Sequence, residues 1–115
     1  MVRFLVISLF LATKSFAERC PVISYENLLQ TLEKKERAEI FFFATWCGDC
    51  LQHMKDAPGR VYIAAFDEQK NAEAVFHKLK LSAPCYTDDD SVKKLKINSV
   101  PAHFLWFNKK LKRIL

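Results

Sequence analysis

The sequence predicts an α/β domain whose sheet contains both parallel and antiparallel strands. Residues 39–45 and 61–66 are apolar runs typical of buried strands, and a helical segment separates them. A strand, a helix and a second strand in that order form a βαβ unit with parallel strands. Residues 102–107 and 111–115 flank Asn108-Lys109, which predicts an antiparallel hairpin. Half of the 115 residues are hydrophobic and ten are phenylalanine, so the composition can fill a core.

The helices between these strands are indicated by caps, breakers and apolar spacing. Ser24 can cap a helix over residues 25–35. A helix that begins at Cys47 is expected to end near Asp56, because Pro58-Gly59 follows. The remaining predicted segments are a helix over residues 71–79, an extended piece over 82–86 around Pro84, and a short helix that opens at Asp88-Asp89-Asp90 with Val92 and Leu95 inward.

The first 17 residues have the features of a secretory signal peptide. Arg3 supplies a short positive start, residues 4–12 an apolar stretch, and Ser15-Phe16-Ala17 a small-residue cleavage site. The alternative is a retained membrane anchor, but the apolar stretch is shorter than the ~20 residues that span a bilayer. We therefore expect a signal peptide over 1–17, one folded domain over 18–115, and export to a bacterial periplasm. A eukaryotic secretory lumen or the extracellular space is the alternative location.

The charge of the chain argues against a nucleic-acid partner. The whole sequence carries +5, and cleavage would remove Arg3 and Lys14 but no acid, which leaves +3. That is an ordinary solvated surface. The basic segment from Lys109 to Arg113 is interpreted as a turn and an exposed strand rather than as a binding patch.

Four cysteines have to be assigned, because an exported protein meets an oxidising compartment in which disulfides persist. Cys47 and Cys50 are separated by two residues, while Cys20 and Cys85 are isolated. Spacing does not determine connectivity, so Cys20 and Cys85 form either a structural disulfide or two separate thiols. Of these two outcomes we favour separate thiols.

The segment Trp46-Cys47-Gly48-Asp49-Cys50 is the main functional motif. It lies where a strand is followed by a helix, so Cys47 is expected beside backbone N–H groups that have no intrahelical partner. Such groups stabilise a thiolate, which is the nucleophile of disulfide exchange. Cys50 lies one turn further on the same face and can close the disulfide or release a mixed disulfide.

Zinc binding is the alternative for two cysteines at this spacing. A tetrahedral site needs two more ligands, usually a second such pair. The chain has no second pair, and His53, His77 and His103 are scattered. We therefore expect no metal and no cofactor. A metal-binding or redox-sensing module that uses Cys47, Cys50 and His53 or His103 is the alternative function.

The chain resembles the thioredoxin superfamily, and within it the exported TlpA/ResA-like thiol-disulfide oxidoreductases. The resemblance covers residues 39–115 and rests on residues 42–50 (FFATWCGDC), 61–68 (VYIAAFDE) and 94–105 (KLKINSVPAHFL). Its specificity comes from the C-x-x-C motif paired with a later V-P at this separation. The resemblance implies a thioredoxin-like three-layer sandwich with a mixed sheet.

The resemblance also implies further residues of a site around the two cysteines. In the family, the proline that matches Pro101 is cis and lies beside the C-x-x-C motif. Pro101 then removes a backbone donor, and Val100 presents its backbone to an extended substrate next to the disulfide. The alternative is an ordinary proline at the start of a strand. Trp46 is expected to form a flat wall beside Cys47, and Gly48 is included among the supporting residues.

Three departures from the family pattern affect the expected reactivity. Most relatives have proline where this chain has Asp49, and a carboxylate there disfavours the thiolate unless it points into solvent. Phe41 occupies the position at which cytosolic thioredoxins bury an acid. ResA-like members have Glu where this chain has His53, which is a candidate proton acceptor near Cys50 or else a half-exposed surface residue.

A fourth departure is the C-terminal helix that covers one sheet face in relatives, since no such helix is predicted here. We therefore expect apolar residues of that face, including Leu105 and Phe107, to be exposed as an interaction or aggregation surface.

Together these features predict an exported thiol-disulfide oxidoreductase with Cys47 as nucleophile and Cys50 as resolving thiol. The resemblance and Asp49 favour reduction of protein disulfides. The expected partners are proteins with disulfides or thiols, and a membrane or soluble thiol donor that recharges the motif. A non-enzymatic remnant of the fold is a further alternative.

Overall fold

A computed structural model describes residues 19–114. The predicted signal peptide, residues 1–17, therefore lies outside the described residues. None of the helices within residues 19–114 is both long and apolar enough to cross a membrane.

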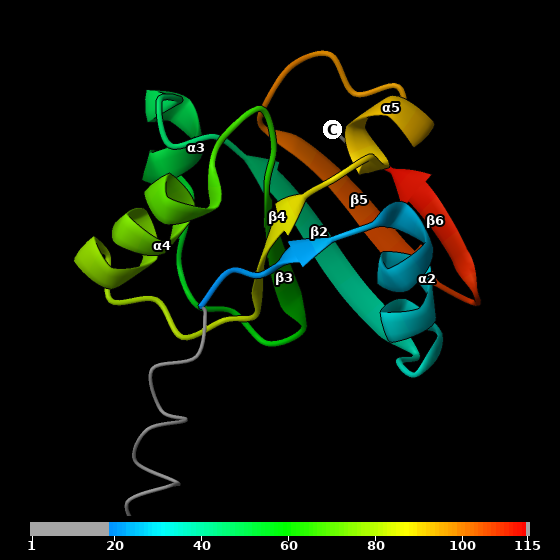
Figure 1. Ribbon diagram of the computed structural model, residues 1–115. Coiled ribbons are helices and arrows are strands. Elements are labelled where there is room, and N and C mark those ends of the chain that lie inside the picture. The colour runs from blue at the N-terminus through cyan, green and yellow to red at the C-terminus, as the bar shows by residue number, and fades with distance from the viewer. Residues whose placement is uncertain (1–18, 115) are drawn as a thin grey trace, which may run out of the picture.

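Six strands form one mixed sheet in the order β1-β4-β3-β2-β5-β6 (Figure 1). They are β1 (Val22–Ile23), β2 (Arg37–Phe43), β3 (Arg60–Ala64), β4 (Cys85–Asp88), β5 (Ala102–Phe107) and β6 (Lys110–Arg113). Strands β1, β4, β3 and β2 run parallel to one another, whereas β5 is antiparallel to both β2 and β6. The predictions of a parallel first pair and of an antiparallel final hairpin are confirmed.

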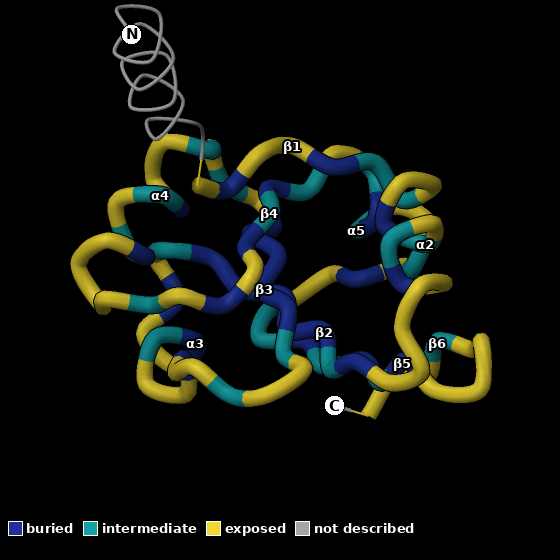
Figure 2. Tube along the Cα trace, turned by 90° about the horizontal axis from the view of Figure 1, so that it is seen from below, coloured by how far each residue is buried: buried dark blue, intermediate teal, exposed yellow. Residues whose placement is uncertain are grey.

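Helices cover both faces of the sheet and complete three layers. They are α2 (Tyr25–Glu33), α3 (Gly48–Gln52), α4 (Gln69–Lys78) and α5 (Ser91–Lys94). Alternate side chains of β2 enter different layers: Phe41 and Phe43 join one buried cluster, and Ile40 and Phe42 join the other. The buried strands occupy the middle of the molecule in Figure 2. The predicted thioredoxin-like sandwich is confirmed.

Helix α3 is shorter than predicted because tertiary contacts capture the chain that follows it. The predicted helix extended to Asp56, but α3 ends at Gln52. The backbone N–H and carbonyl of Lys55 bond to the hydroxyl of Tyr62 on β3. The carboxylate of Asp56 accepts hydrogen bonds from the backbone N–H groups of Ser82 and Ala83. The residues after α3 are thus held against the sheet instead of continuing the helix.

Cys20 and Cys85 are joined in a disulfide, so the preference for separate thiols was wrong. The register of the sheet explains the bond. Strand β1 runs parallel to β4, with Val22 opposite Thr87. Two residues earlier on each chain, Cys20 therefore faces Cys85. Strand β1 has only two residues, so no pattern in the sequence predicted it. Its pairing with β4, which brings the two cysteines together, was therefore not predicted either.

The sheet face that carries Leu105 and Phe107, which a C-terminal helix covers in relatives, is only partly exposed and apolar. Among the described residues no helix follows β6. Phe107 is 56% exposed, as predicted, but Leu105 is half-buried, so the prediction was wrong for that residue. Arg60 forms an ion pair with Glu39, and the Arg37 guanidinium lies 5.9 Å from the centroid of the Phe107 ring. Charged side chains thus make much of this face compatible with water.

Candidate active site

Cys47 and Cys50 lie at the start of α3 and are joined in a disulfide. Strand β2 ends at Phe43, the chain turns, and Cys47 is the N-cap residue in an extended conformation. The backbone N–H of Cys50 points at Cys47 Sγ, with a nitrogen–sulfur distance of 3.1 Å. The N–H group expected beside the first cysteine is therefore present. It acts as one direct hydrogen bond, because a five-residue helix contributes only a small dipole.

The two cysteine residues differ slightly in their exposure to solvent. Cys47 retains 9% of its surface and Cys50 retains none. Cys50 belongs to the cluster beneath α3, together with Phe41, Phe43 and Tyr62. Because a thiol or disulfide partner must reach the sulfur it attacks, Cys47 is the cysteine open to a second protein.

The Val100–Pro101 peptide bond is cis, as the resemblance implies. The antiparallel pairing of β5 with β2 brings this bond to the end of β2 from which the motif emerges. The carbonyl oxygen of Val100 lies 3.9 Å from Cys47 Sγ. Val100 and Pro101 thus stand beside the disulfide, where an extended chain would meet their backbone.

Trp46 and Phe66 form an exposed aromatic pair next to the motif. Trp46 is 66% exposed, and its indole Nε1 donates to the carbonyl oxygen of Phe66 at 3.3 Å. Phe66 has a φ of 58°, which is unusual for a bulky residue and turns the chain sharply after β3. Trp46 was predicted as a wall of the site. Phe66 was not assigned to the site, because a positive φ at phenylalanine has no signal in the sequence.

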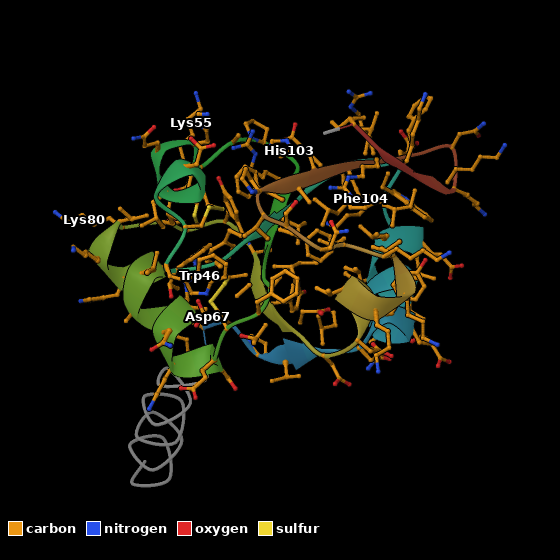
Figure 3. All side chains as sticks on the ribbon, turned by 90° about the horizontal axis from the view of Figure 1, so that it is seen from above. Trp46, Lys55, Asp67, Lys80, His103 and Phe104 are labelled. Carbon is orange, nitrogen blue, oxygen red and sulfur yellow. A yellow bond between two sulfur atoms is a disulfide. The ribbon has the colours of Figure 1, made fainter. Side chains whose placement is uncertain are left out.

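Asp67 joins the loop after β3 to the loop that carries the motif, and Figure 3 shows it close to Trp46. Its carboxylate accepts hydrogen bonds from the N–H of Thr45, at 2.7 Å, and from the Thr45 hydroxyl. It also accepts from the side chain of Asn71 and the N–H of Glu68. Burial alone would raise the pKa of Asp67, but these hydrogen bonds outweigh it and hold the pKa below its usual value. Asp67 is therefore ionised and holds in place the loop between β2 and α3 that carries the motif.

Asp49 and His53 point into an open polar cavity on the other side of α3. Both are exposed. The cavity has a volume of about 420 Å³, and its lining residues are Asp49, Gln52, His53, Lys55, Arg60, Pro101 and His103. Gly48 is also exposed, and an added Cβ there would meet no heavy atom within 4 Å. Nothing steric therefore requires glycine at that position.

His103 lies on the floor of the same cavity, and Figure 3 shows it on the side of the molecule that carries Lys55. Its ring contacts that of Phe41 with centroids 4.3 Å apart. Burial lowers the pKa of His103 below its usual value; Arg60 and His53 act in the same direction, and Glu39 opposes them. The sequence indicated His103 only as a candidate ligand beside Cys47, Cys50 and His53, and the pairing of β5 with β2 is what places it at this cavity.

The part of the chain that the structure describes contains no group of three or more His, Cys, Asp and Glu side chains arranged to hold a metal ion. His53 and His103 line the cavity beside the motif, whereas His77 lies on α4.

No protein-family model and no curated protein matches the chain. Solved structures do match. A structure of dsbF from MTB, in mixed oxidized and reduced forms, has a TM-score of 0.58 at 15% sequence identity and covers 69% of each chain. A thioredoxin-related protein from Neisseria meningitidis serogroup B has a TM-score of 0.51 at 19% identity, covering 69% of this chain and 73% of that one. At these identities the likeness concerns the fold.

The fold and the site together define the chain as a thioredoxin-like domain with an oxidised C-x-x-C motif at the start of its α3 helix. The sulfur chemistry available to such a motif is two-electron exchange between a dithiol and a disulfide.

Proposed function

We propose that the protein is an exported thiol-disulfide oxidoreductase that reduces disulfides of client proteins. The single observation that supports this most is the asymmetry of the motif: Cys47 is accessible and hydrogen-bonded by an N–H group, while Cys50 is buried within bonding reach of it. A thiolate at Cys47 would be stabilised by that N–H group.

In the first step the Cys47 thiolate attacks one sulfur of the client disulfide. A bond forms between Cys47 and that sulfur, and the other client sulfur leaves as a thiolate that takes a proton. The client chain would lie across the carbonyl oxygen of Val100, which is 3.9 Å from Cys47 Sγ. Trp46, exposed beside the motif, offers an apolar contact for the client.

In the second step Cys50 loses its proton and attacks Cys47. The Cys47–Cys50 bond forms, the mixed disulfide breaks, and the client leaves with two thiols. The client gains two electrons and the protein loses two. Because Cys50 is buried, it reacts with Cys47 rather than with a second protein. A membrane or soluble thiol donor must then return two electrons to the motif.

The proposed direction of net transfer, reduction of the client, comes from the resemblance to the TlpA/ResA-like proteins. Asp49 in the middle of the motif is exposed, so solvent screens its charge from the thiols and the carboxylate contributes little to the direction. The signal peptide predicted over residues 1–17 supports a location in the periplasm. A secretory lumen or the extracellular space is the alternative location.

Reduction of insulin, with dithiothreitol as the recharging thiol, tests the assignment of the two cysteines. We expect Cys47→Ser and Cys50→Ser each to reduce the rate to the background of dithiothreitol alone. In a separate reaction without dithiothreitol, pre-reduced Cys50→Ser should accumulate a mixed disulfide with insulin, because no second thiol is present to release it, whereas Cys47→Ser should form none. The control is Ala74→Ser, which introduces a serine at an exposed position of α4 outside the site. It should keep the rate of the parent protein.

Parent-like rates in both cysteine variants would refute the proposal. The direction of transfer has its own measurement, the reduction potential of the Cys47–Cys50 couple. A value near that of thioredoxin, about −270 mV, supports a reductase, and one near −120 mV, roughly that of a strong oxidant, contradicts it.

A further inference from the structure

The end of the molecule opposite α3 carries a concentration of positive charge. We call it the basic hairpin surface. Its seven cationic residues are Lys34, Lys35 and Arg37 around the α2–β2 turn, and Lys109, Lys110, Lys112 and Arg113 in the β5–β6 hairpin. All seven are exposed. Figure 1 shows α3 and this hairpin at opposite ends of the fold.

Contacts join the two segments into one surface around Phe107. Lys34, Lys35 and Lys109 line the same shallow hollow of about 390 Å³, together with Phe107, Asn108 and the carboxylates of Glu33 and Glu36. Arg37 is paired with Phe107 across β2 and β5, and Lys110 is paired with Phe107 across β5 and β6. Cations from two distant parts of the sequence therefore surround one aromatic ring.

The charge of the domain is unevenly distributed. The basic hairpin surface has seven cations and two acids, Glu33 and Glu36, for a net charge of +5. The rest of residues 19–114 holds nine lysines and arginines against ten acids, a net charge of −1. The whole positive excess of the described domain is thus found at one end, and a local field of this kind attracts anionic surfaces.

Protection of an exposed sheet edge accounts for only part of this charge. Lysines on an edge strand such as β6 discourage pairing with other chains. Lys34, Lys35 and Arg37 lie outside β6, so that role does not explain them. The surface also presents an apolar side chain among its cations, since Phe107 is 56% exposed. Cations with interspersed apolar groups are typical of surfaces that settle at a membrane interface.

We propose that the basic hairpin surface docks on the anionic headgroups of a lipid bilayer. Phe107 would reach the headgroup layer, and the lysines and arginines would pair with lipid phosphates. Strand β5 has six residues and separates the hairpin turn from Pro101, a distance of about 20 Å for a strand of this length. A domain docked in this way holds its dithiol away from the membrane, toward clients in solution.

Co-sedimentation of the full chain with vesicles tests the proposal. One set of vesicles contains phosphatidylcholine alone and the other also contains phosphatidylglycerol. We expect stronger binding to the anionic vesicles, weakened by salt because the charges are exposed. Residues 4–12 are apolar and contribute to both sets and to every variant alike, so the comparison rests on the difference between vesicles.

A triple variant, Lys34→Glu, Lys110→Glu and Lys112→Glu, should lose the preference for anionic vesicles. Each cation near an anionic bilayer contributes roughly fivefold in binding, so we expect a loss of about a hundredfold or more. Glutamate side chains on β6 still discourage pairing of this edge strand with other chains, so we expect the variant to fold. The matched control is Lys70→Glu, Lys78→Glu and Lys94→Glu, which changes the net charge equally and should lose less than about tenfold.

If the glutamate variant does not fold, the same three positions are changed to glutamine, and the removal of three cations predicts a loss of about a hundredfold. Equal binding of the parent to both kinds of vesicle would overturn the proposal. Equal losses in the test and control variants would also overturn it, because net charge and not this surface would then be responsible.

Discussion

At the scale of single residues, His103 shows how a scattered residue becomes part of a site. In the sequence it is one of three separate histidines, but the pairing of β5 with β2 places it opposite Phe41 and beside His53. The two motif cysteines were predictable from their spacing and context, and the placement of Val100 and Pro101 beside them from the resemblance. The roles of Phe66 and Asp67 depend on loop geometry, and those of Asp49 and His53 on where α3 ends, so sequence alone could not place their side chains.

The lowered pKa of His103 predicts a stability that depends on pH. The pKa is lower in the folded protein than in the unfolded chain, so below about pH 6.5 the unfolded chain binds more protons. Stability therefore falls as the pH drops through this range. His103→Leu should remove part of that slope, less than the ~1.4 kcal/mol per pH unit that a whole proton would give. Urea unfolding between pH 5 and 8 measures it.

His77→Leu serves as the control for this measurement, because His77 is exposed on α4. It should keep the slope of the parent protein. If His103→Leu leaves the slope unchanged, protonation of His103 does not change the free energy of unfolding, and the prediction is wrong.

At the scale of elements, the continuous apolar pattern of the sequence was sufficient to find the central strands, because β2 and β3 are buried on both faces. It failed at β1, where two residues give no pattern, and at the end of α3, where contacts distant in sequence decide the outcome. The hydroxyl of Tyr62 is the main such contact, since it bonds to both backbone groups of Lys55 and accepts from Arg60 at 3.1 Å.

Tyr62→Phe should therefore loosen the segment after α3. The change leaves the N–H and carbonyl of Lys55 without that partner, and we expect a loss of about 1–3 kcal/mol in the free energy of unfolding. Hydrogen exchange at the Lys55 amide should become faster. Tyr25→Phe is a suitable control, because no hydrogen bond of that hydroxyl is found within residues 19–114. Unchanged exchange at Lys55 would show that other contacts hold the segment.

At the scale of the whole molecule, the Cys20–Cys85 disulfide joins the start of the described chain to β4 across 65 residues. The bond is almost fully buried, with Cys20 at 0% and Cys85 at 3% exposure. The mixed sheet was predictable from the order of the elements, and the two covering layers from the resemblance. This bond was not, because it depends on the pairing of a strand that the sequence does not reveal.

The double variant Cys20→Ala and Cys85→Ala should lower the free energy of unfolding by about 4 kcal/mol, because the crosslink closes a long loop. Cys47→Ala with Cys50→Ala opens a loop of only three residues and should cost about half as much. Urea unfolding of oxidised protein compares the two variants directly. A larger loss for the Cys47→Ala, Cys50→Ala variant would mean that the motif disulfide, and not Cys20–Cys85, is the main structural crosslink.

The two tryptophans occupy opposite environments, and this gives the protein two separate optical reporters. Trp46 is exposed to solvent next to the motif disulfide. Trp106 is 4% exposed, and its indole nitrogen donates to the carbonyl of Lys35 across the layer that α2 covers. We expect emission from Trp46 to respond to the oxidation state of the adjacent motif, and emission from Trp106 to respond to unfolding of the core. One fluorescence spectrum can thus distinguish a change of redox state from a loss of packing.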